Sequence, residues 1–263
     1  MRFKIHLALD KTVFGNVLPI NYQYELASWI YHTIGNGNRN YADWLHENGF
    51  KIGNKRFKFF TFSKLNIPQR KINMDRLTVE SENISFQLSF LPEKSTEEFI
   101  KGVFSERECC LGDKKSKVLF HVSNIELIPP PDLFAINTFT ALSPLVISIK
   151  QPDNKIKYIS PSEDFGYGEL LLQNLKEKYK IYYDSEFSGN NSFFFESISP
   201  VHSNLIKIKA YTKQETRIRG FNFSFQFKAD PQLVEIGYKA GFGEKGSMGF
   251  GMVKAENQPN KYR

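Results

Sequence analysis

The stretch GFGEKGSMGFG at residues 241–251 places five glycines on eleven positions. Glycine loses more chain entropy on folding than other residues, but it adopts positive φ angles and lets another backbone approach closely. The run contains a literal GxGxxG, a pattern that binds dinucleotides where it follows a strand and opens a helix. Here the preceding segment 230–240 predicts a helix, with Asp230 as N-cap and Pro231 in the first turn. Helix, glycine run and short last strand do not fit a dinucleotide-binding fold.

Two interpretations of the glycine run stay open at this point. A glycine-rich loop offers free backbone N–H groups, which suit the phosphates of a nucleic acid backbone. The alternative is a tight structural turn. On the first interpretation the residues that contact phosphate are Gly241, Gly243, Lys245, Gly246, Gly249 and Gly251.

The chain upstream divides at three consecutive prolines, residues 129–131. Proline does not continue a central strand and it stiffens a connection, so we expect one domain over 1–130 and a second over 131–263. In the first domain, periodicity predicts strands at 2–9, 56–65 and 117–128 and a hairpin of 76–80 with 84–91. Periodicity and capping signals predict helices at 21–35, at 40–49 with Asn40 as the cap, and at 95–105 with Ser95 and Glu98 at its start. In the second they predict strands at 145–150, 192–197, 204–212 and 221–227, and helices at 165–183 and 230–240.

Both halves therefore have the element order β-α-β-β-α-β. The fold class expected is α+β, with two tandem ferredoxin-like (RRM-like) domains and a C-terminal glycine-rich loop. The strand FNFSFQF at 221–227 carries a phenylalanine at every second position. Such a face can stack on RNA bases, but strict alternation is more typical of a strand that buries one face in a core, and we expect the core.

The composition favours a folded cytoplasmic protein with a polyanionic partner. The 263 residues carry 35 Lys and Arg against 28 Asp and Glu, a net charge of +7. Cys109 and Cys110 are adjacent, which fits neither a metal-ligand spacing nor a disulfide framework. The N-terminus is a charged alternating strand, and no apolar stretch approaches the roughly 18 residues of a membrane span, so no membrane partner is expected.

His46 is the strongest candidate for proton chemistry, because an imidazole exchanges protons near neutral pH. It ends the second predicted helix and precedes a basic segment that fits a phosphate path. A helix-terminal histidine that merely interacts with the helix dipole is the alternative. Asp43 and Glu47 lie one helical turn apart, but pairs at this spacing commonly only make a helix face polar. With no HxH, HExxH or DxD motif in the sequence, we expect no metal and no cofactor.

These features together resemble a known family. The segment 241–254 is similar to the glycine-rich signature of the RAMP superfamily, and further landmarks resemble the CRISPR-associated repeat-processing endoribonucleases of the Cas6 family: RFKIHLAL, LPINYQYELASWIYHTI, ADWLHE, KFFTFS and LSPLVI, in that order. The resemblance spans essentially the whole chain. It implies two ferredoxin-like domains around a cleft, and metal-independent cleavage of the repeats in a CRISPR precursor RNA, which produces guide RNAs for antiviral defence.

The resemblance also implies an active site. In the family a tyrosine on the first helix, a histidine after the second and a lysine entering the next strand form it, and the matching residues here are Tyr31, His46 and Lys58. The strand entry favours Lys58, whereas distance from His46 favours Lys51 or Lys55. These groups suit attack of the RNA 2′-OH on the adjacent phosphorus, which leaves a 2′,3′-cyclic phosphate and a 5′-hydroxyl.

On the same resemblance the partner is CRISPR repeat RNA. Alternation places Lys207 with Lys209, and Arg217 with Arg219, on shared faces of a predicted hairpin. The basic residues expected to contact RNA are Lys51, Lys55, Arg56, Lys207, Lys209, Arg217 and Arg219. The alternative function is a catalytically inactive repeat-binding subunit of an effector complex. A homodimer and a complex with other CRISPR effector subunits are both compatible with the sequence.

Overall fold

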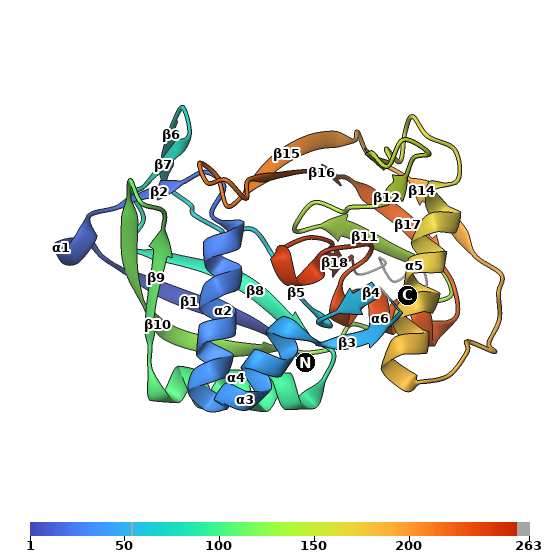
Figure 1. Cartoon of the computed structure of the whole chain (residues 1–263), viewed down its shortest axis with the longest axis horizontal. Coiled ribbons are helices and arrows are strands. Elements are labelled where there is room, and N and C mark those ends of the chain that lie inside the picture. The colour runs from blue at the N-terminus through green and yellow to red at the C-terminus, as the bar shows by residue number, and fades with distance from the viewer. Residues whose placement is uncertain (54, 257–263) are drawn as a thin grey trace, which may run out of the picture.

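Two antiparallel sheets, each carrying helices, form the two halves of the molecule (Figure 1). The computed structural model describes residues 1–53 and 55–256. The strands of the first sheet lie within residues 2–128 and those of the second within residues 137–255. The exact domain boundary near residue 130 stays a prediction.

The first sheet has the strand order β5-β8-β1-β10-β9. Its strands are β5 (Phe60–Phe62), β8 (Asn83–Phe90), β1 (Arg2–Asp10), β10 (Lys117–Ile128) and β9 (Glu108–Gly112). The long helices α2 (Gln23–Gly37) and α4 (Glu93–Ser105) share one buried core with these strands. The helix α2 forms because Leu26, Ile30 and Ile34, spaced by four residues, are fully buried on one face.

The second sheet has the order β14-β17-β11-β18. Its strands are β14 (Phe194–Ser197), β17 (Ser224–Lys228), β11 (Asn137–Ala141) and β18 (Val253–Ala255), with helices α5 (Tyr167–Tyr183) and α6 (Pro231–Ala240). If the strands of each β-α-β-β-α-β unit are counted along the chain, with β9 set aside as an additional edge strand of the first sheet, both sheets read 2-3-1-4. The prediction of two tandem ferredoxin-like domains is therefore confirmed. The alternating phenylalanines at 221–227 are all buried, so they fill the core.

Smaller elements surround the two sheets. They are the helices α1 (Lys11–Phe14) and α3 (Arg39–Glu47), the 3₁₀ helix η1 (Gly246–Met248), the sheet of β2 (Val17–Pro19), β7 (Arg76–Val79) and β6 (Arg70–Asn73), and the hairpins β3–β4 (Phe50–Ile52, Lys55–Phe57), β12–β13 (Ser148–Lys150, Ile156–Tyr158) and β15–β16 (His202–Ile208, Thr216–Asn222). Among the described residues, no helix combines the length and apolar character needed to cross a membrane.

Three predicted strand arrangements were wrong. Residues 76–80 and 84–91 do not form a hairpin, because β7 pairs with β2 and β6 whereas β8 pairs with β1 and β5. The predicted strand 56–65 is broken between β4 and β5, where Phe59 has a positive φ of 52°. The predicted strand 221–227 also divides, since β16 ends at Asn222 and β17 begins at Ser224.

Two predicted helix caps were also wrong. Asn38, with extended backbone, caps α3 by accepting from the backbone N–H of Tyr41 at 3.0 Å, whereas Asn40 lies inside the helix. Helix α4 begins at Glu93, so Ser95 is already helical and its hydroxyl instead hydrogen-bonds Tyr41 at 2.6 Å. Several polar residues lie near the start of each helix in the sequence, and tertiary contacts decide where the helix begins and which residue caps it.

Two hairpins extend from one half of the molecule to the other (Figure 1). The tip of β15–β16 reaches the first domain, where the Tyr211 hydroxyl donates to Asp75 at 2.6 Å. The β3–β4 hairpin reaches α5, where Lys55 forms an ion pair with Glu177. These contacts hold the two domains together at both ends of their interface.

The glycine run lies between the two domains and is held by a buried cation. The ammonium of Lys178 on α5 donates to the carbonyl oxygens of Gly241 and Gly243 at 2.5 and 2.6 Å. Burial lowers the pKa of Lys178 to about 7, and the nearby Glu244 carboxylate acts in the opposite direction. The carbonyl oxygens of Gly241 and Gly243, at the start of the glycine run, are therefore both hydrogen-bonded to Lys178.

Replacing Lys178 by methionine keeps an unbranched side chain but removes the donor. Two buried carbonyls then lose their partner, at a cost of about 1–3 kcal/mol for each unsatisfied group. We expect the free energy of unfolding, measured in urea, to fall by at least about 2 kcal/mol. The matched control is Lys180→Met on the same helix, where a partly exposed ion pair with Glu186 contributes at most about 1 kcal/mol. Equal losses in both variants would contradict the role given to Lys178.

Candidate active site

A pocket of about 480 Å³ lies where α2, α3 and the 3₁₀ helix η1 meet. It contains Tyr31, His46 and Lys58 together, although these residues are far apart in the sequence. The remaining lining residues are Tyr24, Ala27, Ser28, His32, Gly35, Arg39, Ala42, Asp43, Ser247 and Met248. The first domain thus supplies Tyr31, His46 and Lys58, and the glycine run, with Ser247 and Met248, closes the pocket from the second domain.

Tyr31 lies on the inner face of α2 and is mostly enclosed. Its ring packs edge-on against His46, with ring centroids 5.1 Å apart, and against Phe60 of β5 at 5.4 Å. Burial raises the pKa of the Tyr31 phenol, and a side-chain hydrogen bond with Ser247 acts in the opposite direction. The phenol therefore keeps its proton at neutral pH and serves as a hydrogen-bond donor.

His46 occupies the last turn of α3 with its side chain exposed. Helix α3 buries Ala42 and Leu45 against the first domain, which leaves His46 on the side that faces the pocket. The perpendicular contact with the Tyr31 ring restricts the orientation of the imidazole toward a group bound in the pocket. The pocket thus combines an exposed imidazole with an enclosed phenol that keeps its proton.

Lys58 links the pocket to the end of α3. Its ammonium donates to the carbonyl oxygen of His46 at 2.7 Å and to that of Leu45. A cation at this place complements the partial negative charge of a helix C-terminus. Burial, followed by the nearby Arg56 charge, lowers the pKa of Lys58 to about 8. The ammonium is therefore charged at neutral pH but close to losing its proton.

Gly49 makes this approach of Lys58 sterically possible. It follows the end of α3 with a φ of +58°. A Cβ atom here would lie 2.7 Å from the carbonyl oxygen of Phe57 and 2.9 Å from the Lys58 ammonium nitrogen. A side chain at position 49 would thus displace Lys58 from the carbonyls that it caps.

The structure separates the three candidate lysines. Lys58 lines the same pocket as Tyr31 and His46, whereas Lys51 and Lys55 lie on the β3–β4 hairpin outside that lining. The Lys55 ammonium is paired with Glu177, and Arg56 donates to the backbone of Glu47 at 2.8 Å. Proximity favours Lys58, and its role stays a prediction.

The basic hairpin differs in one respect from expectation. Lys207 pairs with Arg217 across β15 and β16, and Arg219 follows two residues later, so these three share one face while isoleucines occupy the buried face. Lys209 does not join them, because β15 ends at Ile208 and Lys209 adopts a φ of 51°. Its ammonium instead lies 5.5 Å from the ring centroid of Tyr24 on α2. This basic face therefore contains three of the four predicted residues, of which the two arginines are exposed and Lys207 is partly buried.

The glycine run makes several internal backbone contacts. The amides of Phe242, Glu244 and Gly251 donate to carbonyls of the protein itself. A Cβ on Gly246 would lie 2.7 Å from the carbonyl oxygen of Phe60, and one on Gly249 would lie 2.5 Å from the Phe62 ring. Close packing on β5 explains these glycines without a ligand, and contact of Gly241, Gly243, Lys245, Gly246, Gly249 and Gly251 with phosphate stays a prediction.

Several pocket residues were not predicted from the sequence. Ser247 reaches Tyr31 from inside the glycine run, where the flanking glycines were the only visible signal. Arg39 and His32 also line the pocket, and Arg39 forms an ion pair with Asp43 at 3.1 Å. In residues 1–53 and 55–256, no group of three His, Cys, Asp or Glu side chains lies close enough to hold a metal ion.

The comparison with solved structures defines the class of protein. One, described as "An RAMP protein binding different RNA substrates", aligns over 98% of this chain and 100% of that one with a TM-score of 0.80 and 25% identity. A second, described as "CRISPR associated protein Cas6", aligns over 98% and 99% with a TM-score of 0.74 and 31% identity. The tandem ferredoxin-like fold is thus that of RAMP proteins.

The sequence comparisons define the family within this class. The N-terminal model of CRISPR-associated protein Cas6 matches residues 17–126, and its C-terminal model matches residues 128–255. The "CRISPR-associated endoribonuclease Cas6 1" of Methanocaldococcus jannaschii is 31% identical over 266 residues, covering 99% of this chain and 96% of the relative. The chain belongs to the Cas6 family.

The cap formed by Lys58 can be tested with two glycines. Both Gly49 and Gly53 have positive φ, of 58° and 53°, so alanine introduces similar backbone strain at each, about 1 kcal/mol. At Gly53 the new methyl group meets nothing within 4 Å, whereas at Gly49 it meets Lys58 and the Phe57 carbonyl. We expect Gly49→Ala to lower the free energy of unfolding by at least about 1 kcal/mol more than Gly53→Ala.

The variants Gly49→Ala and Gly53→Ala also test directly whether Lys58 packs against Gly49. In a Lys58→Ala background the clash with the lysine side chain is gone, so the extra cost of Gly49→Ala should shrink. An unchanged difference between the two glycine variants in that background would show that Lys58 is not packed against Gly49.

Proposed function

We propose that the protein is an endoribonuclease that cleaves CRISPR precursor RNA within its repeats without a metal ion, in the cytoplasm. The observation that carries the proposal is the assembly of Tyr31, His46 and Lys58 around one pocket. Family membership supports RNA as the substrate, because a Cas6 relative is named an endoribonuclease and a RAMP neighbour is described as binding RNA.

The three side chains cover the needs of an RNA transesterification. The 2′-OH of the substrate attacks the adjacent phosphorus in line, its oxygen forms the new P–O bond, and its proton passes to His46. The bond from phosphorus to the 5′-oxygen breaks, and that oxygen takes up a proton. Because burial raises the pKa of Tyr31, its phenol is the protonated donor in the pocket. The products are a 2′,3′-cyclic phosphate and a 5′-hydroxyl.

Lys58 supplies the positive charge in this scheme. Negative charge on the non-bridging phosphate oxygens grows in the transition state, and a fixed cation nearby stabilises it. The carbonyls of Leu45 and His46 hold the ammonium in place before RNA arrives. The cation therefore requires little reorganisation during the reaction.

We assign the RNA path to the surface that leads away from this pocket. On the second domain, Lys207, Arg217 and Arg219 form one basic face of the β15–β16 hairpin, on which both arginines are exposed and Lys207 is partly buried. On the first domain, Lys51 and Arg56 oppose each other on the β3–β4 hairpin. Cationic side chains of this kind position nucleic acid through its phosphates without reading sequence.

Cleavage of a repeat RNA in excess EDTA tests the proposed chemistry. The acid, the base and the cation all come from side chains, so the rate should be unchanged by the chelator, and the products should carry cyclic phosphate ends by mass spectrometry. Loss of cleavage in EDTA with rescue by Mg²⁺ would overturn the mechanism. Tight binding of the RNA with no cleavage in any buffer would instead identify an inactive RNA-binding subunit.

Replacing His46 by alanine separates catalysis from binding. The variant loses the proton-transfer group but no phosphate-binding cation, so single-turnover cleavage should slow by about 10²–10⁴-fold with nearly unchanged RNA affinity. His121→Ala is the control, because His121 lies on β10 and pairs with Asp10 outside the pocket. If His46→Ala cleaves at the wild-type rate and His32→Ala does not, His32 is the histidine that transfers the proton.

The pH dependence reports on Lys58. Its pKa is lowered to about 8, so the required ammonium is present at pH 7 and is lost as the pH rises through 8. We expect kcat/KM, which reflects the free enzyme, to fall tenfold per pH unit above this value. Lys58→Arg keeps its charge at these pH values and should shift the decline upward. A wild-type profile that stays flat to pH 10 would contradict the role of Lys58.

A further inference from the structure

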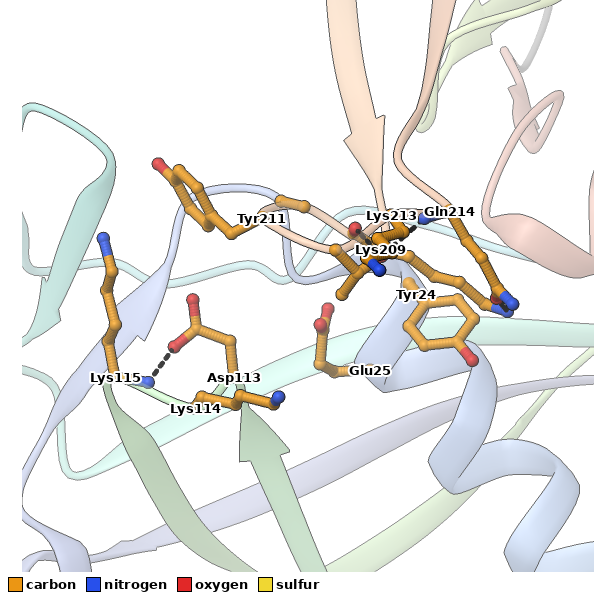
Figure 2. A pocket seen from close by; sticks show the side chains of 11 residues that line it. Tyr24, Glu25, Asp113, Lys114, Lys115, Lys209, Tyr211, Lys213 and Gln214 are labelled. Atoms are coloured by element: carbon orange, nitrogen blue, oxygen red, sulfur yellow. Dashed lines mark hydrogen bonds between the residues drawn. The ribbon is translucent and has the colours of Figure 1, made fainter.

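A second cavity, of about 620 Å³, lies between the two domains away from His46 and Lys58. Figure 2 shows its walls: the first turn of α2, the turn between β9 and β10, and the tip of the β15–β16 hairpin. Its lining residues are Tyr24, Glu25, Asp113, Lys114, Lys115, Lys209, Ala210, Tyr211, Thr212, Lys213 and Gln214. A cavity of this size accommodates a nucleotide-sized group.

Glu25 is the unusual group in this cavity. Its carboxylate extends from α2 between the two turns (Figure 2), and its Oε2 atom is buried without a hydrogen-bond partner among the residues that the structure describes. Burial, with a smaller contribution from Asp113, raises the pKa of Glu25 to about 7, although a hydrogen bond from its own backbone N–H acts in the opposite direction. Asp113 already has a partner, because Arg76 donates to it at 2.8 Å. A ligand that donates N–H groups would satisfy the carboxylate of Glu25.

The rim of the cavity is cationic. Four lysines line it: Lys114, Lys115, Lys209 and Lys213. Lys115 and Lys209 lie over aromatic rings, at 4.3 Å from the ring centroid of Tyr211 and 5.5 Å from that of Tyr24. The cavity thus combines cations for a phosphate, aromatic faces and one acceptor, which are the features that bind a nucleotide.

Tyr24 connects this cavity to the candidate active site, because it lines both. It precedes Tyr31 by seven residues on α2, which corresponds to about 10 Å along the helix. Stacked nucleotides of one strand rise by about 3.4 Å each, so this distance spans about three nucleotides. An RNA strand that is cut beside Tyr31 can therefore reach the second cavity within a few nucleotides.

We infer that the second cavity binds one guanine of the substrate RNA near the cut, with Glu25 as the residue that reads the base. Guanine presents two adjacent donors, N1–H and the 2-amino group, which together fit the two oxygens of a carboxylate. On each of the other bases, a donor on this edge has an acceptor beside it instead of a second donor. Tyr24 or Tyr211 supplies the stacking face, and the rim lysines contact the flanking phosphates. The inference rests on the proposed function, since it needs RNA in the adjacent site.

The test uses a repeat RNA that the wild-type protein cleaves. Nucleotides on each side of the cut are replaced one at a time by guanosine, by inosine, which lacks the 2-amino group, and by each other base. For the wild type we expect one position where guanosine binds about tenfold more tightly than inosine. In Glu25→Ala this preference should disappear, while His46-dependent cleavage of saturating RNA continues.

The matched control is Glu97→Ala, an exposed carboxylate on α4. It should leave the guanosine preference intact. Because the folded state disfavours ionised Glu25, Glu25→Ala should not lower the melting temperature at pH 8, which excludes unfolding as the cause of any loss. Lys114→Ala and Lys213→Ala should weaken binding to all the RNAs alike.

Two results would overturn the inference while leaving the proposed function intact. One is a wild-type protein that cleaves the repeat with no guanosine preference at any position. The other is a preference that persists in Glu25→Ala. A wild-type protein that neither binds nor cleaves repeat RNA would overturn the proposed function as well as this inference.

Discussion

The ammonium of Lys178, buried between the carbonyls of Gly241 and Gly243, fixes the segment on which the candidate site depends. A buried amine is stable only where its donors are satisfied, and here two of them are satisfied by backbone oxygens that would otherwise lack partners. These two hydrogen bonds set the direction in which the glycine run continues. Gly246 then lies against the Phe60 carbonyl, and Ser247 beside it reaches the phenol of Tyr31. A side chain on α5 thus binds the same glycine run that contacts Tyr31 in the candidate active-site pocket.

A second buried cation fixes the relative position of the domains. Arg2, at the start of β1, donates to the carbonyl oxygens of Val253 and Tyr238 at 2.6 Å each, and its guanidinium stacks on the Tyr238 ring at 3.6 Å. The strand β1 is central to the first sheet, whereas both acceptors belong to the second domain. Because the pocket combines α2 and α3 with η1, it exists only while this arrangement is kept. Both Lys178 and Arg2 thus donate to backbone carbonyl oxygens rather than to carboxylates.

Local periodicity was sufficient to predict the order of the main elements, and strand order then followed from the β-α-β-β-α-β pattern. It was insufficient where a strand's partner is decided by distant segments, as with β7 and β8, which are neighbours in sequence but join different sheets. The family pattern identified Tyr31 and His46, and the structure places them in contact. Nothing in the sequence identified Ser247, because its importance arises from the fold of the glycine run against β5. Glu25 was missed for the same reason, since the burial of its Oε2 atom without a hydrogen-bond partner among the described residues is a property of the assembled cavity.

The position of Lys58 explains why a lysine at the entry of a strand, rather than one on the preceding hairpin, suits the proposed reaction. The β3–β4 hairpin extends toward α5, so the side chains of Lys51 and Lys55 lie outside the pocket lining. Lys58 lies after the hairpin, where the chain returns past the end of α3, and its ammonium binds the carbonyl of His46 itself. The cation and the imidazole are therefore positioned by one shared contact. The ammonium is held on the backbone of the same residue whose imidazole lines the pocket, so a scheme that needs both groups at one phosphate finds them already close together.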